Sequence, residues 1–159
     1  MGRSSYTFDT TVPNHAIPHH SRGYPLDKRP APRPGNAAAS LHSTALDYAR
    51  FLQAVLRSEL LSAGGPPRAS GHLTDVAEGV GWGLEWGLEY PDGRESPALW
   101  HWGDNGPFKA FAYLDPSSGV GFVYFANSTN RLSILSRVLN RLFPARHPLL
   151  DWLEYEQAG

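Results

Sequence analysis

Residues 81–90, GWGLEWGLEY, decide the fold class of this 159-residue chain. Large apolar side chains alternate there with glycine or glutamate at all ten positions, with Trp82, Leu84, Trp86, Leu88 and Tyr90 set against Gly81, Gly83, Glu85, Gly87 and Glu89. A strict period of two is typical of a β-strand that packs one face on the core. The following Pro91-Asp92-Gly93 predicts a turn. We therefore predict one strand over residues 81–90.

Three more strands are predicted downstream, over residues 98–103, 109–114 and 120–127. The run DPSSG at 115–119 supplies the turn before the last of them. Connections this short join antiparallel neighbours, since a parallel pair needs a long crossover. The sequence therefore predicts a four-stranded antiparallel meander in the order 81–90, 98–103, 109–114, 120–127.

Two helices are predicted on either side of these strands in the sequence. Thr44 and Asp47 have the spacing of a capping box, and a largely apolar run to about residue 58 follows them. Leucines recur at helical spacing over 130–143, before Pro144 stops the helix: Leu132, Leu135, Leu139 and Leu142. The expected fold class is α+β, an antiparallel sheet flanked by helices.

Residues 1–40 differ in character from the rest of the chain. Six of the 14 prolines lie there, and no apolar periodicity persists. We predict an irregular Pro-rich arm over 1–40 and a single domain over 41–159. Tyr6, Phe8 and Ile17 are more apolar than a disordered tail needs, so they are candidates for a surface that another part of the protein covers.

Composition excludes several classes of protein. Fourteen basic against 15 acidic residues give no electrostatic reason to expect a nucleic-acid partner. The absence of cysteine excludes disulfides, thiolate metal sites and cysteine nucleophiles. The longest apolar stretch, over 120–126, is far too short to span a membrane. Residues 1–10 lack the apolar core of a signal peptide.

No metal ion and no cofactor are predicted. His15, His19 and His20 lie close together in the Pro-rich arm, but no carboxylate accompanies them at ligand spacing, so we interpret them as loop histidines. His42 and His72 stand alone in the sequence and are interpreted as structural.

The segment 100–108, WHWGDNGPF, is the main candidate for a functional site. It ends a predicted strand with His101, and Gly103 beside it would let a ligand approach the backbone. A histidine packed in the core of a strand rich in tryptophan explains the same pattern equally well. The residues alone leave both interpretations open.

A series of short motifs resembles the serine β-lactamase-like family, which includes class C β-lactamases, D-alanyl-D-alanine peptidases and related esterases. The segment 35–56, GNAAASLHSTALDYARFLQAVL, is similar to the family's stretch of small residues, Ser-Thr, Asp and a buried helix. Further matches follow in the family's order, covering about residues 35–130: GWGL at 81–84, HWG at 101–103, FKAF at 108–111, LDP at 114–116, GVG at 119–121 and NS at 127–128.

The resemblance implies roles for five residues. The triplet His101-Trp102-Gly103 takes the place of the family's third motif, Lys-Thr-Gly or His-x-Gly, on the strand that flanks the nucleophile. His101 would supply hydrogen bonding or positive charge near the substrate, and Gly103 would permit close approach. The backbone N–H of Asp104 would be one of two oxyanion-hole donors. Trp102 and Asn105 would contact the substrate, a small molecule or a peptide.

The chain departs from the family in lacking its nucleophile. The two lysines, Lys28 and Lys109, follow Pro25 and Gly106 by three positions, so Ser-x-x-Lys is absent, and Tyr-x-Asn or Tyr-x-Ser is absent too. The family places both motifs upstream of the matched region. We therefore expect this chain to be the C-terminal part of a serine hydrolase that cleaves amides or esters, and to be inactive alone. We expect it to bind an N-terminal half in trans or to self-associate.

A second hypothesis is a non-catalytic module that binds a ligand or a protein through a tryptophan-rich sheet. Four of the five tryptophans, at positions 82, 86, 100 and 102, lie close together in the sequence, and their faces can stack on sugars or peptides. Packing of the same rings into the core is the alternative. No compartment is predicted, because the chain is expected to begin inside the family's domain.

Overall fold

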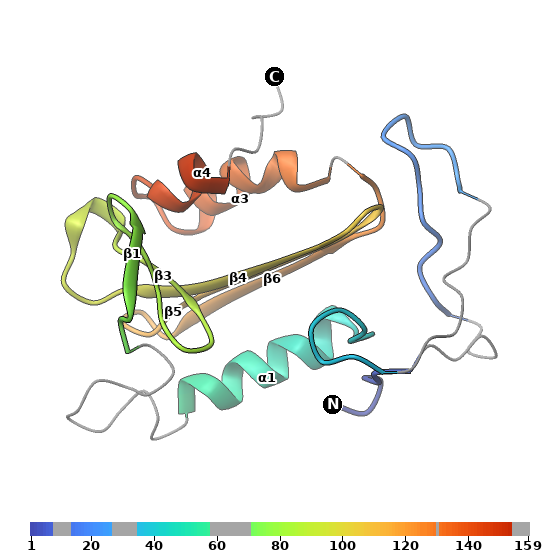
Figure 1. Ribbon diagram of the computed structural model, residues 1–159, viewed down its shortest axis with the longest axis horizontal. Coiled ribbons are helices and arrows are strands. Elements are labelled where there is room, and N and C mark those ends of the chain that lie inside the picture. The colour runs from blue at the N-terminus through green and yellow to red at the C-terminus, as the bar shows by residue number, and fades with distance from the viewer. Residues whose placement is uncertain (8–13, 27–34, 58–70, 130, 154–159) are drawn as a thin grey trace.

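An antiparallel sheet of six strands forms the middle layer of the structure (Figure 1). The computed structural model describes residues 1–7, 14–26, 35–57, 71–129 and 131–153. The strands lie side by side in chain order: β1 (Thr74–Ala77), β2 (Val80–Trp82), β3 (Gly87–Glu89), β4 (Ala98–Asn105), β5 (Phe108–Asp115) and β6 (Val120–Ala126). The α+β class and the antiparallel sheet flanked by helices are confirmed, whereas the predicted number of four strands is wrong.

The predicted strand over 81–90 is in fact a hairpin. β2 ends at Trp82 and β3 begins at Gly87, and these two residues face each other across the pair. The Gly83 N–H donates to the Trp86 carbonyl at 2.8 Å, and Leu84 at the tip is 70% exposed. The prediction fails because a period of two continues through both arms of a short hairpin, so the alternation carries no signal of the reversal.

β1 was not predicted at all. All four of its residues are exposed, so it has no apolar alternation to detect. It pairs with β2 at the edge of the sheet, with an irregularity in register between Asp75 and Ala77. A bulge of this kind at an edge strand interrupts the row of unpaired backbone groups that invites further strands.

Helices cover both faces of the sheet (Figure 1). Helix α1 (Ala45–Arg57) packs on one face, where Leu52 joins a buried cluster with residues of β3, β4 and β5. The short 3-10 helix η2 (Arg131–Ile134), α3 (Leu135–Leu142) and α4 (Pro148–Leu153) cover the other face. A further 3-10 turn, η1 (Pro91–Gly93), leads from β3 towards β4. Side chains therefore alternate along β4 between two cores, with Leu99 in the α1 core and Trp100 in the α3–α4 core.

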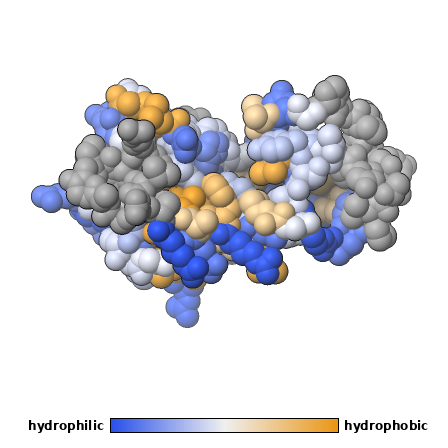
Figure 2. All heavy atoms as spheres, turned by 90° about the horizontal axis from the view of Figure 1, so that it is seen from below, coloured by the Kyte–Doolittle hydropathy of each residue, from blue (hydrophilic) through white to orange (hydrophobic). Residues whose placement is uncertain are grey.

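The predicted capping of α1 forms in part. The Thr44 hydroxyl accepts a 3.1 Å hydrogen bond from the Asp47 N–H. Leu52 is 3% exposed, whereas Leu46 and Phe51 of the same helix are 63% and 37% exposed. Figure 2, seen from the α1 side, shows hydrophobic residues across the middle of this face.

The described part of the arm lies near the end of the sheet at which β6 terminates (Figure 1). The His19 N–H donates to the Asn127 carbonyl at 2.7 Å, and the only pairing in these arm residues consists of isolated bridges. Tyr6 and Ile17 are 49% and 53% exposed, as expected for an uncovered apolar surface, and Phe8 lies outside the described residues. Within the described ranges, no helix has the length and apolarity to cross a membrane.

Candidate functional site

The candidate site lies on the hairpin of β4 and β5, the two longest strands. Seven residue pairs join them, from Leu99 opposite Leu114 to Asn105 opposite Phe108. The turn contains only Gly106 and Pro107, and Gly106 adopts a φ of +63°. A glycine with positive φ at the first position of a two-residue turn matches the right-handed twist of the two strands. The hairpin therefore carries residues 101–105 in a fixed, extended conformation.

One side of this segment has no strand partner in the part of the chain that the structure describes. β3 pairs with residues 98–100 of β4 only, while β5 pairs with β4 as far as its last residue. We call residues 101–105 on the side away from β5 the open edge. Backbone groups of successive strand residues point to opposite sides, and those of Trp100 face β3. By this alternation, the N–H groups of Trp102 and Asp104 point to the open edge.

Gly103 leaves space next to the open edge. A Cβ atom built on it would have as its nearest neighbour the Ala110 Cβ, at 3.6 Å. An alanine would therefore fit at this position, so crowding by neighbouring atoms does not require a glycine here. A glycine here instead leaves the backbone accessible to another molecule.

His101 is exposed and sits against two tryptophan rings. Its ring centroid lies 5.7 Å from that of Trp82 and 5.9 Å from that of Trp102. Its Nδ1 lies 2.8 Å from the Trp102 carbonyl oxygen. Because a carbonyl oxygen only accepts, Nδ1 carries the proton in this bond, and Nε2 is the nitrogen that can accept one. The side chain is thus oriented with a defined tautomer beside the open edge.

The Asp104 side chain stabilises the hairpin rather than the open edge. Its carboxylate forms an ion pair of 2.5 Å with the Lys109 ammonium and accepts a 3.1 Å hydrogen bond from the Gly106 N–H. The Lys109 side chain is 8% exposed, so this ammonium needs the Asp104 charge. Asp104 therefore presents its backbone N–H, and not its side chain, to a ligand at the open edge.

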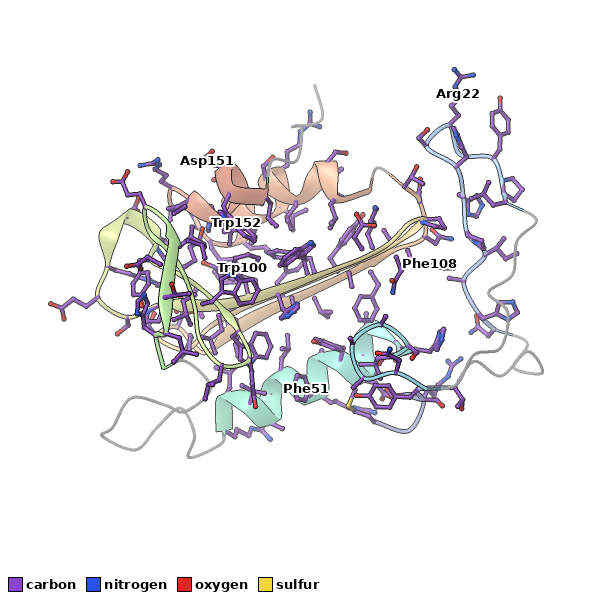
Figure 3. The ribbon with its side chains drawn as sticks, in the orientation of Figure 1. Arg22, Phe51, Trp100, Phe108, Asp151 and Trp152 are labelled. Carbon is purple, nitrogen blue, oxygen red and sulfur yellow. The ribbon has the colours of Figure 1, made fainter. Side chains whose placement is uncertain are left out.

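Trp102 and Asn105 also have partners of their own. The Asn105 amide donates to the Ala39 carbonyl at 3.1 Å and so ties the hairpin to the loop before α1. Trp102 is half-buried in what we call the tryptophan cluster, in which ring centroids lie 5.4–6.2 Å apart: Trp82, Trp100, Trp102 and Trp152. Figure 3 shows Trp152 of α4 directed towards Trp100 of the sheet.

The five candidate residues do not share one face of the sheet. Trp102 packs on the α3–α4 side, whereas the Asn105 side chain bonds to the loop before α1. The His101 ring lies against Trp82 and Trp102. What the structure brings together is the His101 ring, the backbone at Gly103 and the N–H of Asp104, all along the open edge. A hollow of about 310 Å³ lies elsewhere, between β5 and the end of α3, and Arg94 and Asp115 help to line it.

Sequence reasoning missed a buried polar cluster at that other end of the sheet. Glu89, grouped by alternation with the polar positions, is 0% exposed, and His147 next to it is 5% exposed. Glu89 and His147 are 58 residues apart in the sequence, and no local pattern connects them. Their burial follows only from the packing of the segment after α3 against β3.

Two histidines of the arm lie within hydrogen-bond distance of residues close to them in the sequence. His19 Nδ1 lies 2.8 Å from the Ile17 carbonyl oxygen, and His20 Nδ1 lies 3.1 Å from the Ser21 hydroxyl. Among the described residues, no three histidine, aspartate or glutamate side chains are placed to hold a metal ion.

Comparison with known proteins gives one result. Searches of curated proteins and of solved structures returned no match. The family model described as Beta-lactamase matches residues 1–138, which is most of the chain and includes α1, the sheet and the open edge. The chain therefore belongs to the Beta-lactamase family, in agreement with the motifs at residues 35–130.

Proposed function

We propose that this chain carries the C-terminal part of the active site of a serine hydrolase that cleaves amide or ester bonds. The observation that supports it most is the open edge of β4, where an oriented histidine, a glycine and an outward backbone N–H follow one another. In the reaction we envisage, a serine Oγ attacks the substrate carbonyl carbon. The carbonyl C–N or C–O bond breaks as the leaving amine or alcohol takes the proton that the serine hydroxyl gave up, and water then hydrolyses the acyl-enzyme to the acid and the free serine.

Each residue of the open edge has a proposed role in that reaction. The Asp104 N–H donates to the oxyanion that forms on the carbonyl oxygen, an interaction typically worth about 3 kcal/mol per donor. His101 offers Nε2 to accept or return a proton near the substrate. Gly103 lets the substrate backbone lie against the strand. Trp102 and Asn105 border the substrate while they hold the strand in place.

The nucleophile is assigned to a polypeptide other than these 159 residues, because the sequence contains neither Ser-x-x-Lys nor Tyr-x-Asn or Tyr-x-Ser. The chain alone would supply one oxyanion donor and no activated serine. We therefore expect the purified chain to hydrolyse chromogenic β-lactams and p-nitrophenyl esters no faster than buffer. Stoichiometric labelling of a single serine by a fluorophosphonate probe would contradict this assignment.

The complementary test adds a polypeptide that carries the Ser-x-x-Lys and Tyr-x-Asn motifs which these 159 residues lack. Hydrolysis of the same substrates should appear in the mixture and depend on this chain. The His101→Ala and Gly103→Val variants should each lower kcat/KM at least tenfold in the mixture. The matched control is His72→Ala, which removes an exposed histidine that is paired with Asp75 of the edge strand β1. Equal rates for His101→Ala and His72→Ala would refute the role of His101.

The alternative of a tryptophan-based binding module has less support. None of the five tryptophans is exposed: Trp86 and Trp100 are buried, and Trp82, Trp102 and Trp152 are half-buried. Stacking on a sugar or peptide needs an accessible ring face. Quenching of tryptophan fluorescence by a panel of oligosaccharides or peptides, without hydrolysis in the complemented mixture, would favour this alternative.

Self-association of the isolated chain belongs to the same proposal. The exposed Tyr6 and Ile17 in the arm and Leu46 on α1 leave apolar area that a second polypeptide of the hydrolase would cover. The tryptophans add nothing to this surface, because all five are buried or half-buried. Light scattering should therefore show oligomers of the isolated chain, and a monodisperse monomer with a high, cooperative melting transition would count against the proposal.

A further inference from the structure

Glu89, His147 and Tyr113 form a buried polar cluster that has no part in the proposed reaction. His147 Nδ1 lies 3.0 Å from Glu89 Oε2, and both side chains are 0% exposed. The Tyr113 hydroxyl donates to the same Oε2 at 2.8 Å. The Leu149 N–H donates to Glu89 Oε1 at 3.1 Å. One carboxylate thus connects β3, β5 and the first turn of α4.

The partners of His147 require a proton between Glu89 and the imidazole. His147 Nε2 lies 2.8 Å from the Phe143 carbonyl oxygen, which only accepts, so Nε2 is protonated. Nδ1 faces a carboxylate oxygen, so a hydrogen bond there needs one more proton. With that proton on Nδ1 the pair is an imidazolium and a carboxylate. Without it, a buried carboxylate faces the lone pair of Nδ1, which is unfavourable.

The same cluster fixes the position of α4. His147 directly precedes Pro148, the first residue of α4, and its carbonyl accepts from the Leu150 N–H at 3.1 Å. One turn later, the Trp152 ring lies 5.6 Å from both Trp100 and Trp102 and 6.2 Å from Trp82. Trp82 and Trp102 are the two rings in contact with His101.

We infer that Glu89 and His147 form a proton-dependent lock that holds α4 on the sheet and so keeps Trp152 in the tryptophan cluster behind His101. Loss of the shared proton releases α4 and removes the support of that cluster. The existence of the lock is independent of the proposed function. Its effect on catalysis rests on the proposed function, because it acts through the ring contacts of His101.

The charges around the cluster leave Glu89 as the main partner of His147. The nearest cations have acidic partners of their own, since Arg94 pairs with Asp115 at 3.2 Å and Arg146 with Asp151 at 3.7 Å. Asp92 adds a more distant negative charge and accepts from the Arg146 N–H at 3.1 Å. Glu89 and Tyr113 contact His147 directly, Asp92 acts on it as a further charge, and Arg94 and Asp115 line the same hollow as His147.

The direction of titration agrees with this geometry. Burial by itself lowers the pKa of His147, but the hydrogen bond and charge of Glu89 outweigh it, so the pKa lies above its ordinary value of 6.5. A histidine with a raised pKa in the folded state stabilises the fold fully below its unfolded pKa. That stabilisation is lost as the pH rises through the folded-state pKa.

The lock can be tested on the chain as it is, by recording near-UV circular dichroism and tryptophan fluorescence between pH 6 and pH 10. We expect a one-proton transition in the tryptophan signals at a midpoint above 6.5, with unchanged far-UV signal. The Glu89→Gln variant should lose the transition, because a neutral amide no longer requires the imidazolium. The control His72→Gln, which breaks an exposed histidine–aspartate pair, should retain it. Persistence of the transition in Glu89→Gln, or its absence from the unmodified chain, would overturn the inference.

Nitrogen NMR of the unmodified chain tests the same point without a variant. At pH 6 both ring nitrogens of His147 should be protonated, and one proton should leave at the midpoint of the optical transition. A His147 ring with a single protonated nitrogen at pH 6 would overturn the lock. In the complemented hydrolase, kcat/KM should fall with the same midpoint in the unmodified chain and in His72→Gln. If the mixture shows no hydrolysis, the proposed function fails while the optical and NMR results still decide on the lock.

Discussion

The backbone N–H of Arg3 lies 2.6 Å from Asp47 Oδ2, across a separation of 44 residues. The Ser4 hydroxyl donates to the same oxygen at 3.2 Å. Asp47 occupies the third position of α1, where its own N–H is bonded to Thr44. The capping segment of α1 thus also anchors the first residues of the chain. The backbone bond from Arg3 is the main reason why the pKa of Asp47 lies below its ordinary value.

We expect Asp47→Asn to destabilise the protein at pH 7 and to make its stability less dependent on pH in the acidic range. A carboxyl whose pKa is lowered in the folded state stabilises the fold at pH values above its unfolded-state pKa of 3.8. This contribution is lost as the pH falls through the folded-state pKa. The urea midpoint of the variant should therefore be lower at pH 7 and approach that of the unmodified chain as the pH falls below 3.8. Asp75→Asn, at an exposed carboxylate, serves as the control. A constant difference at all pH values would contradict the prediction.

Gly87→Ala should destabilise the sheet by about 1–3 kcal/mol, because overpacking forces neighbours to shift. A Cβ atom on Gly87 would lie 2.5 Å from the Trp100 ring, which is 0% exposed and cannot move aside. Gly103→Ala is the matched strand variant, and its Cβ would meet only Ala110 at an ordinary 3.6 Å. Its free energy of unfolding should change by less than about 1 kcal/mol. Urea unfolding of both variants measures the difference, and equal values would refute the packing argument.

Asp104→Ala should cost about 1–3 kcal/mol, because it leaves a buried donor without its partner. The group in question is the Lys109 ammonium, whose side chain is 8% exposed. Adding Lys109→Met removes that unpaired charge, so the double variant should be more stable than Asp104→Ala alone. A double-mutant cycle by urea unfolding gives the coupling free energy, and strictly additive effects would show that the pair contributes nothing.

Leu52→Ala should lower the free energy of unfolding by about 2–5 kcal/mol, as is typical for truncation of a buried leucine. Leu52 packs in the α1 core and reaches to within 3.8 Å of the position of a Cβ on Gly121. Leu46→Ala removes the same atoms from a side chain of α1 that is 63% exposed, and should change stability by less than about 0.5 kcal/mol. A comparable loss in thermal melting for both variants would mean that α1 buries a different face.

Much of the sheet could be predicted from local pattern. The sequence predicts strands at 98–103 and 109–114 with short connections between them, and the structure extends them to β4 and β5. The hairpin at residues 83–86 could not be predicted, because both of its arms continue the same alternation. The exposed strand β1 offered no apolar pattern at all.

The sequence by itself determined the α+β class, the start of α1 directly after Thr44 and the motif around His101, because these depend on neighbouring residues and on short periods. Only the tertiary structure decided that β3 ends before residues 101–105, which have no strand partner on that side among the described residues. It also decided that Glu89 is buried against His147, 58 residues away. Pairing and burial of this kind depend on which distant segments pack together, and a local pattern of residues does not predict such long-range contacts.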